Sequence, residues 1–191
     1  MNICVYGASS DLIDKSFIEA AEGLGRELAK RGHTLIFGGG AGGVMGASAR
    51  GVASENGKII GITPEFFNVD GMVYESCSEL IRPATMRERK KMLEDMSDGF
   101  IMAPGGIGTF DEFFEILTLK QLSRHTKAIA IYNVNNYFGD LLNLMKKAIE
   151  ENFVKEECLE LYRVFDDAGE LLDYMEGYKP VDLDILNFKN I

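Results

Sequence analysis

The sequence is poor in the side chains on which metal-dependent and thiol-dependent proteins rely. It has two histidines, three cysteines and no tryptophan among 191 residues. Because Cys4, Cys77 and Cys158 are isolated and odd in number, they make neither a disulfide framework nor a Cys-x-x-Cys metal pair, and a reducing cytoplasm suits them. With only His33 and His125 and no HExxH, a zinc site or a serine–histidine hydrolase has few parts to work with. We therefore expect no bound metal.

Long apolar runs and an excess of basic charge are missing too. No segment approaches the ~18 consecutive apolar residues of a membrane-spanning helix, and the start MNICVYGASSD does not resemble a signal peptide, so we expect no membrane partner. Lys and Arg number 20 against 30 Asp and Glu, which gives a formal net charge of -10. That field repels a nucleic-acid duplex, so nucleic acid is not an expected partner, and an anionic small ligand needs a local positive site.

What is present is the pattern of a layered α/β protein. Apolar residues make up 46% and charged residues 26%, as in soluble globular chains, and the length suits one domain with a sizeable core. Short apolar runs alternate with longer segments of helical periodicity, which predicts a Rossmann-like, doubly wound fold with a mostly parallel sheet and helices on both faces. We expect a single nucleotide-binding domain over residues 1–191. The expected strands are 2–7, 34–37, 58–62, 99–103 and 128–132, and the expected helices are 15–31, 43–56, 85–97, 107–122, 137–152 and 166–176, with 63–82 irregular.

Loops of small residues follow three of the expected strands, at residues 7–10, 38–43 and 105–109. Ligands of doubly wound folds bind at the carboxyl ends of the strands, so these loops locate the site. Glycine lets an anion approach the free N–H groups of a helix start, which favours a phosphate, although each loop alone also fits a tight turn. Since neither GxxxxGK[ST] nor an acid after the second strand is present, a mononucleotide or sugar phosphate remains. Ser9 and Ser10 add hydroxyl groups, either for that ligand or for capping the turn.

The expected helix 85–97 carries an arginine among apolar side chains. On a helical wheel Arg89 falls inside the apolar arc, Lys90 sits at its margin, and Arg87 lies on the solvated side. A buried arginine is costly unless it meets an anion. Arg89 therefore either snorkels or forms a structural ion pair, or its guanidinium holds a phosphate or carboxylate. The arc consists of Met86, Met92, Leu93 and Met96.

The expected helix 107–122 is apolar in nearly every direction, which indicates burial on several sides and suits a subunit interface. Glu112 nevertheless shares its face with Ile116 and Leu119, and Glu115 lies one turn further along. Asp111 points away from this face of the helix. Acids in the first turn also complement the helix dipole, but that does not explain an acid in an apolar stripe. The pattern indicates acid–base or cation-stabilising chemistry beside a phosphate loop.

Three motifs then resemble those of one enzyme family. The segment PGGIGTFDE at residues 104–112 matches the PGGxGTxxE signature of the LOG ("Lonely Guy") family. The segment MRERK at residues 86–90 looks like the family's MxxRK element. The segment FGGG at residues 37–40, with Met45-Gly46, is similar to its YGGGxxGLMG loop, with Phe at the usual Tyr. The resemblance runs in order from Cys4 to about Met175.

The resemblance implies a phosphoribohydrolase. LOG proteins split cytokinin riboside 5′-monophosphates, and often AMP, into free base and ribose 5-phosphate. They need no metal or organic cofactor, and they form dimers or larger oligomers, so a homodimer is expected. The family's catalytic pair, the Arg of MxxRK and the Glu of PGGxGTxxE, falls on Arg89 and Glu112. The substrate contacts expected from the glycine loops, the resemblance and the neighbouring acids are Ser9, Gly39, Gly40, Arg89, Lys90, Gly105, Gly106, Ile107, Gly108, Thr109, Asp111, Glu115 and Thr118.

The chemistry of the reaction agrees with these positions. Cleavage of an N-riboside passes through an oxocarbenium-like ribosyl cation, which a carboxylate near C1′ stabilises while it orients or deprotonates water. Glu112 is the expected carboxylate, and the 5′-phosphate is expected on the N–H groups at residues 106–109. Arg89 either binds the substrate or fixes Glu112. The sequence does not show the acid that protonates the leaving base.

Other functions remain open at this stage. A non-catalytic nucleotide or molybdenum-cofactor carrier shares such glycine loops, but it does not need Arg89 and Glu112 together. A DNA-processing protein of the DprA type shares the fold but requires a basic surface, which the net charge disfavours. Lysine decarboxylase is an old label of this family, and nothing in the sequence resembles the pyridoxal-phosphate site that such chemistry needs. Because residues 64–82 depart from the plant sequences, prenylated adenine, AMP and other nucleotides all remain possible bases.

Overall fold

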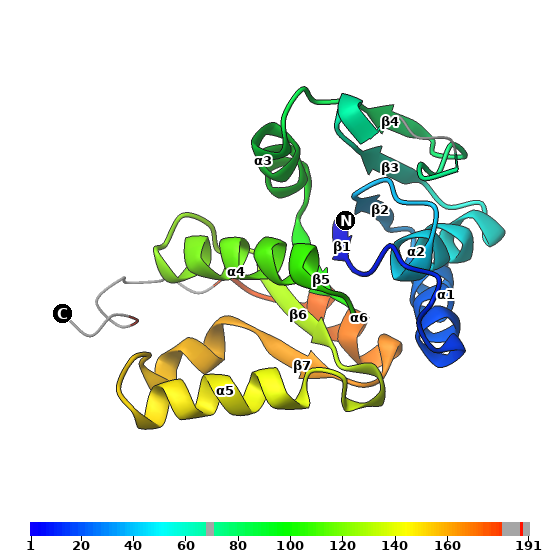
Figure 1. Ribbon diagram of the computed structural model, residues 1–191. Coiled ribbons are helices and arrows are strands. Elements are labelled where there is room, and N and C mark those ends of the chain that lie inside the picture. Colours follow the sequence, from blue (N-terminus) through cyan, green and yellow to red (C-terminus); the bar gives the residue numbers. More distant parts are fainter. Residues whose placement is uncertain (68–70, 181–187, 189–191) are drawn as a thin grey trace.

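The strands of this protein form one parallel sheet. The computed structural model describes residues 1–67, 71–180 and 188. Its seven strands lie in the order β4-β3-β2-β1-β5-β6-β7, and every neighbouring pair is parallel (Figure 1). The predicted fold class is confirmed. The strands are β1 (Asn2–Tyr6), β2 (Thr34–Phe37), β3 (Ile59–Ile62), β4 (Glu79–Ile81), β5 (Gly99–Met102), β6 (Ala128–Tyr132) and β7 (Arg163–Phe165).

Helices cover both faces of the sheet, because each inner strand buries both of its faces. Along β1, Ile3 and Val5 pack in one core cluster, and Cys4 and Tyr6 pack in the other. The helices over the first face are α1 (Lys15–Lys30), α2 (Gly43–Ser54) and α6 (Ala168–Gly177). Those over the second face are α3 (Met86–Met96), α4 (Ile107–Gln121) and α5 (Gly139–Glu150). No helix in the described part of the chain is long and apolar enough to span a bilayer.

The direction in which the chain adds strands reverses at the centre of the sheet. β1 pairs with β2 on one side and with β5 on the other, so a crevice forms outside the carboxyl ends of β1 and β5. The loops that leave these two strands are tied together, since Ala8 N donates to Pro104 O at 3.0 Å. At this edge the sheet therefore brings together the loops after β1, β2 and β5.

The two outermost strands are the strands that the sequence does not predict. The expectation of an irregular segment over residues 63–82 is wrong at Glu79–Ile81, which forms β4, and the same segment holds a short 3-10 helix, η1 (Glu65–Phe67). β7 lies between the last two expected helices. Each of these edge strands pairs with one neighbour. Each has three residues, and a segment of that length is too short to show a periodic pattern in the sequence.

Candidate active site

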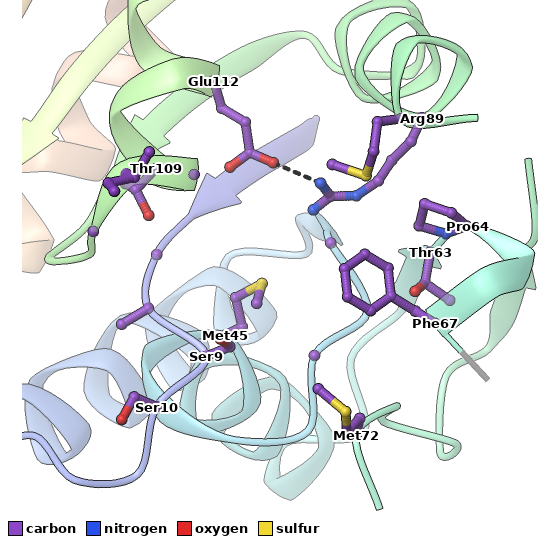
Figure 2. Close-up of a pocket in the computed structure, with 18 of the residues that line it drawn as sticks. Ser9, Ser10, Met45, Thr63, Pro64, Phe67, Met72, Arg89, Thr109 and Glu112 are labelled. Carbon is purple, nitrogen blue, oxygen red and sulfur yellow. Dashed lines mark ion pairs between the residues drawn. The ribbon is translucent and has the colours of Figure 1, made fainter. Parts of the chain in front are cut away.

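A cavity of about 440 Å³ opens at the carboxyl ends of β1, β2 and β3. One wall is made by the loop after β1 and the first turn of α4, and the opposite wall by the residues that follow β3 (Figure 2). Arg89 from α3 and Glu112 from α4 lie between these walls, and Figure 2 shows them pointing toward each other. The cavity lies where the glycine loops predict a ligand site.

Arg89 and Glu112 form a buried ion pair. Arg89 Nη1 lies 3.0 Å from Glu112 Oε1, and each side chain is 10% exposed. The Nε of Arg89 also donates to Ile62 O at 3.1 Å, which fixes the guanidinium at the end of β3. A Cβ on Gly38 would lie 2.1 Å from Arg89 Nη2, so only glycine leaves room for this side chain. The arginine that the helical wheel places on the inner face therefore meets a carboxylate.

The local sequence explains how α3 presents Arg89. Thr85 and Glu88 form a capping box, in which Thr85 Oγ1 accepts from Glu88 N at 3.2 Å and Glu88 Oε2 accepts from Thr85 N at 3.1 Å. The expected apolar arc is narrower in the structure, because Met86 and Met92 are 37% and 36% exposed. Met86 lines the ligand cavity instead of the core. The wheel gives the direction of each side chain but not whether protein or open space faces it.

Burial makes Glu112 a weaker acid than an exposed glutamate. Removal from water raises the pKa of Glu112 to about 7, the positive charge of Arg89 opposes that rise, and Asp111 adds to it. A carboxyl group that titrates near neutral pH can act as a general base there. The ion pair therefore holds a carboxylate that can both stabilise positive charge and accept a proton.

The two glycine-opened helices differ in how far internal partners take up the backbone N–H groups of their first turns. At the start of α2, Asp11 Oδ1 accepts from Gly43 N at 2.7 Å, and Met45 N donates to Ala8 O at 3.1 Å. At the start of α4, the N-cap Gly106 makes no side-chain capping bond, and residues 106–108 are exposed. The positive end of α4 therefore faces the cavity without an internal anion.

The residues of the loops after β1 and β5 take different places around this helix start. Ser10 Oγ accepts from Leu12 N at 3.2 Å and so caps its own turn, whereas Ser9 lines the cavity without such a bond among the described residues. Gly105 packs closely against Thr109, because a Cβ on Gly105 would lie 2.1 Å from Thr109 Oγ1. The expected contacts that line the cavity are Ser9, Gly40, Arg89, Gly106, Ile107, Gly108 and Thr109.

Four of the expected contacts lie in a second, more open groove on the outer side of α4. Lys90 Nζ is 3.1 Å from Asp111 Oδ2 and 3.0 Å from Glu115 Oε2, and Thr118 lines the same groove. Ile107 borders both the groove and the cavity. Gly39 and Gly105 are close to the cavity but do not line it. These four residues therefore line the outer groove and not the cavity that holds the Arg89–Glu112 pair.

The wall opposite the α4 start contains residues that the sequence motifs do not single out. Thr63, Pro64 and Phe67 follow β3, and Met72 lies beyond them in the chain. The glycine loops and the charged motifs gave no signal for these side chains. Pro64, Phe67 and Met72 belong to residues 64–82, the segment whose departure from the plant sequences leaves the choice of base open. Among residues 1–67, 71–180 and 188, no three His, Cys, Asp or Glu side chains gather where they could hold an ion.

Comparison with protein families and curated proteins finds one family. A family model described as "Possible lysine decarboxylase" matches residues 45–175. The chain is 36% identical over 178 residues to the cytokinin riboside 5′-monophosphate phosphoribohydrolase LOG3 of Arabidopsis thaliana, covering 93% of this chain and 83% of that protein. It is 35% identical to the probable phosphoribohydrolase LOGL6 of Oryza sativa subsp. japonica, covering 93% of this chain and 71% of that protein.

Comparison with solved structures finds the same fold at low sequence identity. The molybdenum cofactor binding protein of Rippkaea orientalis superposes with a TM-score of 0.70 at 20% identity, covering 92% of this chain and 95% of that chain. DNA processing protein A of Streptococcus pneumoniae superposes with a TM-score of 0.58 at 11% identity, covering 93% of this chain and 62% of that chain. These similarities concern the fold alone.

Proposed function

Since the chain belongs to the LOG family of cytokinin riboside 5′-monophosphate phosphoribohydrolases, we propose that its cavity hydrolyses the N-ribosidic bond of a purine riboside 5′-monophosphate, AMP included. The products are the free base and ribose 5-phosphate. One observation carries the proposal: a buried Arg89–Glu112 pair lies in a cavity that has an uncapped helix start at one end. We place this enzyme in the cytoplasm.

The substrate lies across the cavity in a defined direction. Its 5′-phosphate binds the free N–H groups of Ile107, Gly108 and Thr109, where the helix dipole favours an anion and compensates for the negative net charge of the chain. The ribose then lies beside Glu112, and the base lies against the wall after β3. As the bond breaks, the carboxylate of Glu112 stabilises the ribosyl cation and takes a proton from the attacking water. Arg89 holds that carboxylate in place.

AMP is expected to yield adenine and ribose 5-phosphate in equal amounts, and adenosine is expected to react with a kcat/KM at least about 100-fold lower. Adenosine lacks the phosphate whose binding at the α4 start positions the ribose, and remote binding of this kind raises the rate at the reacting bond. The measurement is chromatography of the released base, with N6-prenylated AMP and IMP included to rank the bases. Tight binding of AMP without release would contradict the proposal and support a carrier.

The apolar outer side of α4 is proposed as the interface of a homodimer. Ile107 is 88% exposed and Phe114 is 37% exposed, and both line the open groove beside Phe110. Apolar side chains gathered on one exposed face are typical of a subunit contact. The groove also holds the Lys90 ion pairs described above.

Light scattering is expected to give the mass of a dimer for the wild type and of a monomer for Phe114→Glu. The new carboxylate would be buried without a partner at the contact, which disfavours association. Phe66→Glu is the matched control, because Phe66 is 61% exposed and belongs to η1, away from the groove. A monomeric wild type at micromolar concentration would overturn the interface.

A further inference from the structure

The Thr63 hydroxyl belongs to the cavity wall that follows β3. Thr63 follows β3, lines the cavity and is 4% exposed. Its backbone N donates to Ile81 O at 3.0 Å, but its hydroxyl makes no hydrogen bond within the described residues. Because Thr63 lines the cavity, its hydroxyl is free to pair with a ligand bound there.

The position of Thr63 along the cavity identifies which part of the substrate it meets. Figure 2 shows Thr63 beside Pro64 and Phe67, across the cavity from Ser9 and Thr109. The phosphate site lies at the far end, and the Arg89–Glu112 pair lies between the two ends. If the phosphate occupies the α4 start, the base reaches the wall that contains Thr63.

Thr63 is the polar side chain that this wall offers to the base. The other polar side chains that line the cavity are accounted for: Ser9, Ser10 and Thr109 lie at the phosphate end, and Arg89 and Glu112 pair with each other. Around Thr63 the wall is apolar, with Pro64, Phe67 and Met72. In such surroundings a hydrogen bond to a developing charge is stronger than in water.

We propose that the Thr63 hydroxyl is the leaving-group contact of the reaction, donating a hydrogen bond to a purine ring nitrogen; this inference rests on the proposed function. When the oxygen of water bonds to C1′, the C1′–N bond breaks and its electron pair passes to the purine. Glu112 takes the proton of the water, and Thr63 keeps its own proton while its hydrogen bond stabilises the negative charge on the ring. The purine then takes up a proton from solvent, and Glu112 releases one.

Thr63→Val tests this role, because it removes the hydroxyl with little change in shape. For AMP we expect kcat to fall about 30-fold or more with KM within about twofold, since the hydrogen bond strengthens as the base leaves. Thr63→Ser keeps the hydroxyl and is expected to stay within about threefold of wild type. Ribose 5-phosphate has no base, so its inhibition constant should be the same for wild type and Thr63→Val, which confirms an intact pocket.

A second substrate separates leaving-group stabilisation from simple packing. The 5′-monophosphate of 6-chloropurine riboside carries a base that holds negative charge more easily than adenine, so Thr63→Val should lose less activity with it than with AMP. An equal loss on both substrates, or an unchanged rate with AMP, overturns the leaving-group contact while the proposed function stands. A wild type that releases no base from any nucleotide overturns the proposed function itself, and this contact with it.

Discussion

Glu112→Gln is expected to lower kcat for base release about 1,000-fold, because an amide can neither take the proton of water nor stabilise the ribosyl cation with a full charge. The side-chain amide has the shape of the carboxyl group, and its oxygen can still accept from Arg89, which lies 3.0 Å from Glu112 Oε1 in the wild type. The fold should therefore survive. The measurement is single-turnover release of adenine from AMP, together with thermal unfolding of both proteins.

The pH dependence of kcat/KM distinguishes Glu112 from a residue that only shapes the pocket. Burial raises the pKa of Glu112 to about 7, and the carboxylate is the active form, so wild-type activity should rise with pH and level off above about pH 7. In Glu112→Gln this rise of activity with pH should be absent. Glu19→Gln is the matched control, because Glu19 is exposed on α1 and should leave both the rate and the profile unchanged. Full activity in Glu112→Gln would remove the basis of the mechanism.

Arg89→Ala is expected to lower kcat/KM about 100-fold and to move the acidic limb of the profile above pH 7. The positive charge of Arg89 lowers the pKa of Glu112, so its removal leaves a buried carboxyl group that holds its proton to higher pH. The variant also loses the hydrogen bond from Nε to Ile62 O that fixes the pair at β3. The measurement is the pH profile of base release, with circular dichroism to show that the protein is folded.

Arg87→Ala is the control for this substitution. Arg87 lies two positions earlier on α3 and is exposed, so the same loss of charge occurs without a change at the cavity. Its rate and its pH profile should match those of the wild type. If Arg89→Ala kept the wild-type profile, Arg89 would not act through Glu112, and its role would be limited to binding the substrate.

The inner face of α3 shows what a helical pattern can and cannot predict. The wheel places Arg89 beside Leu93, and both are buried in the structure. The same wheel places Met92 in the buried arc, where it is exposed. Periodicity reports which side chains share a face, but the extent of that face depends on how far neighbouring elements reach, which only packing decides.

The groove beside α4 shows the corresponding limit for sequence motifs. Lys90 and Asp111 lie in the same motifs as Arg89 and Glu112, and the sequence groups them all at one site. In the structure Lys90 turns to Asp111 and Glu115 on the outer side of α4, away from the ion pair. Adjacent residues on a helix point about 100° apart, so neighbours in a motif can serve different surfaces.

The sequence by itself determined the alternation of strands and helices, the glycine loops and the inward direction of Arg89 and Glu112, because each follows from local periodicity or from a backbone that only glycine fits. The tertiary structure decided which residues meet across the fold. The carboxylate of Asp11 accepts a hydrogen bond from the first residue of α2. The ammonium group of the buried Lys120 donates to Leu161 O at 2.8 Å, and Thr63 lines the cavity. Such contacts join residues distant in the chain, and only the packing of helices on the sheet brings them within hydrogen-bond distance.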